Sequence, residues 1–124
     1  MKKLFFIVII LLCLIGCSKD NNGNNNDDNI VSYMEAKEMI INDGAILVDV
    51  RTEDEYNEEH IDGALLLSLD TITEESAVDV IDSKDSYIIL YCQSGNRSHQ
   101  ALEKLEELGY TNVYDLGAIS NWEE

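Results

Sequence analysis

The stretch Tyr87-Ile88-Ile89-Leu90-Tyr91-Cys92-Gln93-Ser94-Gly95-Asn96-Arg97-Ser98 joins an apolar run to a polar loop that contains one glycine. Its first five residues are uninterruptedly apolar, which predicts a buried strand over residues 87–91. From Ser98 to Leu108 apolar side chains recur at helical spacing, and Gly109 is expected to end that helix. Cys92 thus precedes a helix N-terminus, where loop amides and the helix dipole favour a thiolate. Cys92 is a candidate nucleophile, and the polar residues after it predict that it is not fully buried.

Three further apolar runs predict strands at residues 46–50, 64–67 and 113–116. Helices are predicted between them, from Ser32 to the stop at Asn42-Asp43-Gly44, from Thr52 to about Glu59, and at about residues 73–81. The first two begin with the pattern of a capping box, in which a Ser or Thr is followed three residues later by Glu. Residues 117–124 are too few for a prediction.

Short aliphatic strands that alternate with helices indicate an α/β fold, in which a mainly parallel central sheet is flanked by helices on both faces. Open sheets of this kind bind ligands beyond the carboxyl ends of their strands. Cys92 follows such a strand end, so fold and candidate nucleophile indicate the same place.

The N-terminus has the order of an export signal. Lys2 and Lys3 precede the apolar run 4–15, which is short for a membrane span, and Leu14-Ile15-Gly16-Cys17 resembles a bacterial lipobox. We therefore expect residues 1–16 to be a lipoprotein signal peptide and Cys17 to carry the lipid. The protein would then be lipid-anchored to the cell membrane at its extracytoplasmic face. Ordinary secretion, or an uncleaved N-terminal helix, is the alternative.

Residues 17–29 comprise the lipidated cysteine and an Asn- and Asp-rich segment with no apolar residue to bury, which predicts a flexible tether. Residues 30–124 have the length of one small domain. Cleavage before Cys17 would also remove Cys13, leaving Cys92 as the one free thiol of the folded part. An unpaired cysteine in an exported protein suggests a reactive role.

The chain is strongly acidic, with 25 Asp and Glu against 8 Lys and Arg and a formal net charge of −17. Nucleic acid is therefore not an expected partner, because phosphate contacts need clustered basic side chains. The two histidines, the thiol and the scattered carboxylates do not have the spacing of a metal site, and no cofactor is expected.

Four sequence elements together resemble the single-domain rhodanese (sulfurtransferase) family. They are Val48-Asp49-Val50-Arg51 with Glu55-Tyr56, His60-Ile61-Asp62-Gly63-Ala64, the loop from Cys92 to Ser98, and Asp115-Leu116-Gly117-Ala118 with Trp122. Asp62 stands where the family commonly has proline, and Ala118 where it often has a second glycine. The resemblance implies a rhodanese-like three-layer sandwich over residues 30–124.

The resemblance also implies a mechanism. Cys92 would take sulfane sulfur from a donor such as thiosulfate, polysulfide or a persulfide, and pass it to cyanide or a thiol. The loop residues that would bind the substrate and stabilise the persulfide are Gln93, Ser94, Gly95, Asn96, Arg97 and Ser98. Arg97 would either bind an anionic donor or brace the loop. The expected partners are a small sulfur substrate or a protein persulfide or thiol, and the protein is expected to be a monomer.

Four other residues of the motifs are assigned structural roles. Arg51 and Glu55, four apart at a helix start, are expected to pair, and Asp49 to bind neighbouring amides. His60 is expected to make a structural hydrogen bond. His99, on the first helical turn behind the loop, is interpreted as a solvated side chain rather than a proton donor.

Two other functions remain open. Thiol-dependent phosphatases, and arsenate reductases of related fold, also combine a cysteine, an arginine and a loop of amides, but they place five residues between the two side chains where this chain has four. A smaller ring suits a persulfide sulfur better than a tetrahedral phosphate. The second alternative is a non-catalytic rhodanese-like module that senses sulfur species or binds a protein.

Overall fold

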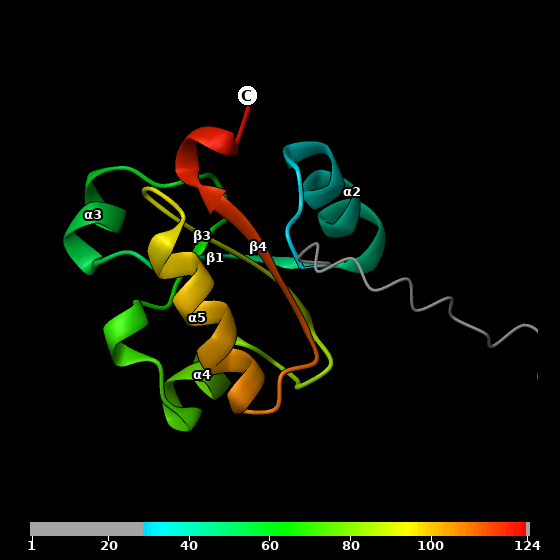
Figure 1. Ribbon diagram of the computed structural model, residues 1–124, viewed down its shortest axis with the longest axis vertical. Helices are drawn as coiled ribbons and strands as arrows, with labels where there is room; N and C mark the ends of the chain where they lie inside the picture. Colours follow the sequence, from blue (N-terminus) through cyan, green and yellow to red (C-terminus); the bar gives the residue numbers. More distant parts are fainter. Residues whose placement is uncertain (1–28, 124) are drawn as a thin grey trace, which may run out of the picture.

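The computed structural model describes residues 29–123, and the predicted signal peptide and Cys17 lie outside them, as does nearly all of the tether. Within these residues, four parallel strands form one sheet in the order β2-β1-β3-β4. The strands are β1 (Ile46–Asp49), β2 (Leu65–Leu66), β3 (Tyr87–Cys92) and β4 (Asn112–Ala118). The predicted α/β class with a parallel sheet is confirmed (Figure 1).

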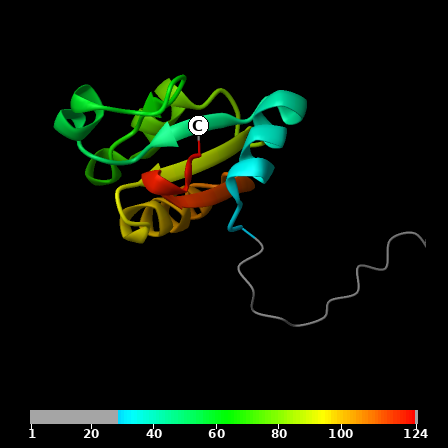
Figure 2. The ribbon, with the colours of Figure 1, turned by 90° about the horizontal axis from the view of Figure 1, so that it is seen from above.

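Helices cover both faces of the sheet, which gives three layers (Figure 2). They are α2 (Tyr33–Asp43), α3 (Glu53–Glu58), α4 (Glu74–Val80) and α5 (Asn96–Glu107). A 3-10 turn, η1 (Leu69–Thr71), lies between β2 and α4, and a second, η2 (Ile119–Asn121), follows β4. Ala77 of α4 and Leu105 of α5 belong to the core on one face, and Ala36 of α2 to the core on the other. Successive residues of β3 alternate between the two cores, because strand side chains point to opposite faces.

The helix starts show why the local sequence adopts this fold. Ser32 and Glu35 at α2, and Thr52 and Glu55 at α3, form the predicted capping boxes, in which side chains bind the otherwise unpaired backbone amides. A third box at Thr73 begins α4. No helix within residues 29–123 has both the length and the apolar character that a membrane crossing requires.

Several boundaries differ from the predictions. The strand predicted at residues 64–67 is only Leu65–Leu66, whereas the last strand extends to Asn112–Ala118. The register of β3 with β4 shifts between Leu90 and Tyr91, which leaves Leu116 as an extra residue in β4. The amide of Gly117 bonds the Asp115 carboxylate at 2.8 Å, which stabilises this bulge.

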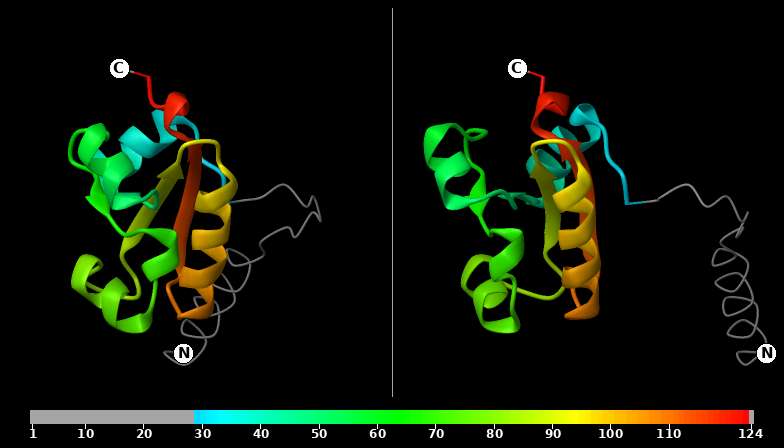
Figure 3. Two further views of the ribbon diagram at one scale, coloured as in Figure 1. Left: turned by 90° about the vertical axis from the view of Figure 1, so that its left-hand side faces the viewer. Right: turned by 60° about the vertical axis from the view of Figure 1, so that its left-hand side comes forward.

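The candidate site lies at the carboxyl ends of the strands. Both views in Figure 3 show the turn after β3 at the same end of the molecule as η2, and α5 running back along the sheet. At the outer edge, Asn29 and Val31 bond Asp115 of β4 through the backbone, so the chain joins the domain beside this last strand.

Candidate active site

Cys92 is the last residue of β3, a central strand that pairs with β1 and β4. Its side chain is fully buried, so the prediction of partial exposure is wrong. The cause is the alternation along β3, which turns Cys92 to the face that α5 covers. The polar residues that motivated the prediction, Gln93 and Ser94, are indeed exposed, but they follow the strand and do not share the orientation of the Cys92 side chain.

The sulfur has two polar neighbours. The backbone amide of Gly95 donates to Cys92 Sγ at 3.0 Å, and Ser98 Oγ lies 3.6 Å from it. Ser98 in turn donates its hydroxyl proton to the Gly95 carbonyl at 3.0 Å. Negative charge on this sulfur would therefore meet an amide donor at the positive end of a helix dipole.

Helix α5 begins at Asn96, two residues before the predicted start at Ser98. Three of the six residues predicted to form the loop, Asn96, Arg97 and Ser98, are therefore on the first helical turn. The helix ends as predicted near Gly109, whose amide and that of Tyr110 bond back to Glu106 and Leu105. The connection between the sulfur-bearing residue and the helix is thus only Gln93, Ser94 and Gly95.

We predict that Gly95→Ala weakens both stability and sulfur chemistry. Gly95 has a φ of 98°, a left-handed conformation that costs an L-residue about 1 kcal/mol, although an added Cβ would make only ordinary van der Waals contacts with the backbone of Gly117 and Ala118, the nearest at 3.7 Å. Gly44→Ala is the matched control, because Gly44 has a φ of 66°, open space around it and a position far along the chain from Cys92. Urea unfolding should show similar losses for both variants. The rate of persulfide formation should fall about tenfold only for Gly95→Ala, and equal rates would contradict the role of its amide.

Arg97 of α5 forms a two-pronged ion pair with Glu55 of α3, with Nη1 to Oε1 at 2.7 Å and Nη2 to Oε2 at 3.0 Å. The predicted pairing of Glu55 with Arg51 is wrong. In the folded chain Glu55 of α3 binds Arg97 of α5, and Arg51 binds Asp49 instead. The Arg97 guanidinium lowers the pKa of Glu55 to about 2, and Glu55 raises the pKa of Arg97, with a smaller contribution from charge at Cys92. Arg97 therefore braces the turn against α3.

The low pKa of Glu55 predicts a pH dependence of stability. A carboxyl with a lowered pKa in the folded state stabilises fully above its unfolded pKa, and this stabilisation is lost as the pH falls through the folded value. We expect the unfolding free energy of wild type to fall more steeply between about pH 5 and pH 2 than that of Glu55→Gln, which keeps the cap at Thr52. Chemical denaturation across this range measures it. Glu58→Gln, an exposed change on the same helix, should follow wild type, and parallel curves for Glu55→Gln and wild type would refute the assignment.

A buried polar network lies beneath the turn. The Asp49 carboxylate accepts from Arg51 Nη2 at 2.7 Å, from the Arg51 amide at 2.9 Å and from the Tyr91 hydroxyl at 2.9 Å. Arg51 also donates to the Glu59 carbonyl at 2.6 Å and contacts Gln93 Oε1 at 3.4 Å. Asp49 raises the pKa of Arg51, and burial raises that of Tyr91. The network connects β1, β3 and the segment after α3 to the first residue of the turn.

Tyr91 is the network member that sequence reasoning missed. It stands in an apolar strand, whose pattern predicts only a side chain of the hydrophobic core. Its hydroxyl accepts from the Ile61 amide at 3.2 Å while donating to Asp49. The available signal was that a buried tyrosine hydroxyl needs polar partners, and Asp49 ends the neighbouring strand.

The two histidines lie apart from the sulfur's contacts. His60 is exposed, bonds the Tyr56 carbonyl at 2.7 Å through Nδ1 and stacks on the Tyr56 ring. His99 is also exposed and lies 3.3 Å from Glu103 one turn along α5. Within residues 29–123, no three His, Cys, Asp or Glu side chains are grouped closely enough to hold a metal ion.

Comparison with known proteins places the chain in a family. The model of the rhodanese-like domain matches residues 32–124. Thiosulfate sulfurtransferase PspE of Escherichia coli (strain K12) is 38% identical over 74 residues, which is 60% of this chain and 70% of the relative. Thiosulfate sulfurtransferase GlpE of Coxiella burnetii (strain RSA 331 / Henzerling II) is 34% identical over 93 residues, 74% of this chain and 84% of the relative.

Solved structures agree with this placement. A rhodanese with anions from E. coli superposes with a TM-score of 0.58 at 32% identity, covering 62% of this chain and 89% of that one. The family match includes both the strand of Cys92 and the motifs on which the predicted resemblance rests. The chain belongs to the rhodanese-like family.

Proposed function

We propose that this protein is a sulfurtransferase that carries sulfane sulfur as a persulfide on Cys92. The observation that carries the proposal is the 3.0 Å contact from the Gly95 amide to Cys92 Sγ at the N-terminus of α5. An amide and a helix dipole directed at one sulfur stabilise the thiolate that attacks and the negative charge that remains on the persulfide. The names of the thiosulfate sulfurtransferase relatives support the same reaction class.

The reaction has two balanced steps. The Cys92 thiolate attacks the outer sulfur of thiosulfate, a new S–S bond forms, and sulfite leaves with the electron pair of the broken S–S bond. Cyanide or a thiolate then attacks the outer sulfur of the persulfide, and the electron pair of that S–S bond returns to Cys92 as thiolate. The protein cycles between thiolate and persulfide, so covalent catalysis needs no cofactor.

Arg97 supports this assignment over the phosphatase alternative. Both of its Nη atoms are bound by the Glu55 carboxylate, so its positive charge is already paired with a carboxylate of α3. Four residues separate Cys92 from Arg97, which leaves a tight turn around the sulfur. An anionic donor would instead bind the amides of the turn and the N-terminus of α5. Polysulfide or a protein persulfide could bind the same groups.

Turnover separates an enzyme from a sulfur sensor. We expect thiocyanate to accumulate over many cycles when the protein is given thiosulfate, or polysulfide, together with cyanide. A persulfide that forms once and is passed to neither cyanide nor a thiol would favour the sensor alternative and count against the proposed enzyme.

We also propose that Cys17 anchors the protein to the extracytoplasmic face of the cell membrane, on the support of the lipobox-like sequence and the preceding apolar run. Metabolic labelling of the expressed full chain with a clickable fatty acid should mark wild type. Cys17→Ser should lose the label and move to the soluble fraction. Cys13→Ser is the matched control and should keep it, whereas label that persists in Cys17→Ser would contradict the anchor.

A further inference from the structure

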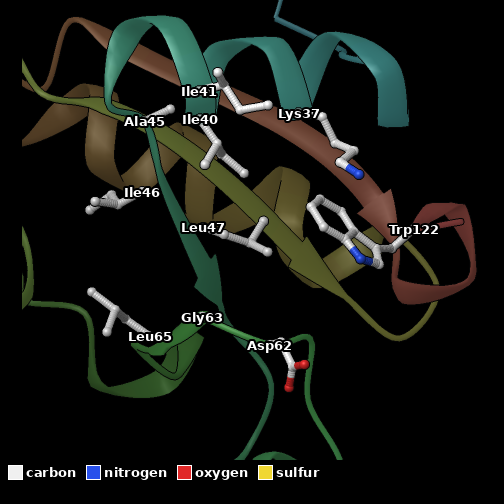
Figure 4. A pocket seen from close by; sticks show the side chains of 10 residues that line it. All are labelled: Lys37, Ile40, Ile41, Ala45, Ile46, Leu47, Asp62, Gly63, Leu65 and Trp122. Atoms are coloured by element: carbon white, nitrogen blue, oxygen red, sulfur yellow. The ribbon is translucent and has the colours of Figure 1, made fainter. Parts of the chain in front are cut away.

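A groove lined mainly by apolar side chains lies between α2 and the β1–β2 edge of the sheet. Its volume is about 320 Å³. Ile40 and Leu47 lie along it, Lys37 and Trp122 are at one end, and Leu65 is at the other (Figure 4). The neighbouring Ile41 is 76% exposed, and Leu65 itself is 42% exposed. Exposed apolar surface gathered around a groove is typical of a contact site for another molecule.

A second hollow of about 360 Å³ shares two lining residues with the groove, Asp62 and Trp122. Ile61 and Ile119 also line the second hollow. Ile119 directly follows Ala118, the strand partner of Cys92, and the Ile61 amide is bound by the hydroxyl of Tyr91, the residue before Cys92. The second hollow therefore borders the carboxyl ends of β3 and β4 on the face of α2, and the Cys92 sulfur lies at the same strand ends on the face of α5.

The charges around this path are mostly negative. Glu59 and Asp62 are exposed beside the second hollow. Lys37 is the basic member of the apolar groove's lining, and its ammonium lies 5.2 Å from the centre of the Tyr33 ring. With a net charge of −17, a second copy of this chain would bring the same excess of negative charge to the interface. Charge complementarity therefore favours a basic partner.

We propose that the groove and the second hollow dock a basic protein that exchanges sulfur with Cys92. An apolar side chain of the partner fills the groove beside Trp122, and its Lys or Arg residues face Glu59 and Asp62. This inference rests on the proposed function for the exchange itself, and it names the substrate class as a protein cysteine, rather than a small anion.

Binding alone tests the docking, without sulfur chemistry. The probe is a short fluorescent peptide with a Leu-Phe pair, flanking lysines and one cysteine, and its two comparators replace the lysines with glutamates or the Leu-Phe pair with Ser-Ser. Fluorescence anisotropy is measured with the full chain carrying Cys92→Ser. We expect the basic apolar peptide to bind at least tenfold more tightly than either comparator, and we expect its affinity to fall with added salt. Equal affinities for the three peptides would overturn the proposal.

Variants locate the binding surface. The double variant Ile41→Ser with Leu65→Ser should weaken the binding of the basic apolar peptide at least fivefold. Asp62→Asn should have the same effect through loss of charge. The matched controls are Val78→Ser and Asp79→Asn, which alter exposed residues of α4. Binding that is unchanged in the double variant, or weakened as much by the controls, would overturn the proposal. So would self-association of the full chain that the double variant abolishes, because the groove would then hold a second copy.

Transfer to the peptide cysteine then separates this inference from the proposed function. In chains that retain Cys92, we expect the double variant to transfer sulfur to the basic apolar peptide at least fivefold more slowly than wild type, while transfer to cyanide stays unchanged. If no persulfide forms with any donor, the proposed function fails, but the anisotropy result still decides the docking. Equal slowing with cyanide and peptide would place the defect at Cys92 and overturn the docking proposal.

Discussion

Replacing Cys92 with serine should reduce thiocyanate production by about 10³-fold or more, to the level of the uncatalysed reaction. A serine hydroxyl is not deprotonated by one amide and a helix dipole, and an oxygen cannot form the S–S bond that stores the sulfur. The side chain is fully buried and similar in size, so the fold should survive the change. Steady-state assays, together with circular dichroism to verify folding, measure the effect.

The other cysteines of the chain provide the matched controls for this experiment. Cys13→Ser and Cys17→Ser leave Cys92 in place and should retain the turnover number of wild type in the purified full chain. Substantial turnover in Cys92→Ser, or loss of turnover in either control, would show that the reacting thiol is elsewhere.

Replacing Asp49 with alanine should have the largest effect on stability, a loss of about 3–5 kcal/mol in unfolding free energy. The change leaves the Arg51 side chain, which is only 5% exposed, without its carboxylate partner, and it leaves the Tyr91 hydroxyl without an acceptor. An unpaired charge in a low-dielectric interior is far more costly than the loss of a surface ion pair. Urea unfolding monitored by fluorescence measures the loss.

Two further variants test the cause of that loss. Asp79→Ala removes an exposed aspartate of α4 and should change stability by about 0.5 kcal/mol or less. The double variant Asp49→Ala with Arg51→Met removes both charges and should recover part of the stability lost in Asp49→Ala. A double variant no more stable than Asp49→Ala would mean that the unpaired arginine is not the main cost.

The sequence was sufficient for the features that depend on local patterning. Apolar runs identified the positions of β1 and β3, and capping residues identified the first turns of α2 and α3. It was less informative where tertiary contacts decide the outcome. The edge strand β2 keeps only two residues in the ladder, and the two 3-10 turns have no periodicity that a sequence pattern detects.

The candidate site shows the same division. Adjacent residues predict Cys92, its turn and the following helix. The burial of the sulfur, however, depends on which face of the sheet α5 covers. Helix α5 also starts earlier than its apolar pattern, because Asn96 and Arg97 are polar members of its first turn. The partner of Arg97 is 42 residues away in sequence, so spacing within one helix suggested Arg51 for Glu55 instead. Ion pairs between separate elements follow from the assembled fold and not from local spacing.

Intact-mass spectrometry of the protein after incubation with thiosulfate or polysulfide tests the persulfide most directly. We expect that wild type gains the mass of one sulfur atom, that cyanide removes it with release of thiocyanate, and that Cys92→Ser gains nothing. Wild type that gains no sulfur from either donor, or Cys92→Ser that gains one, would contradict the assignment of Cys92 as the sulfur carrier.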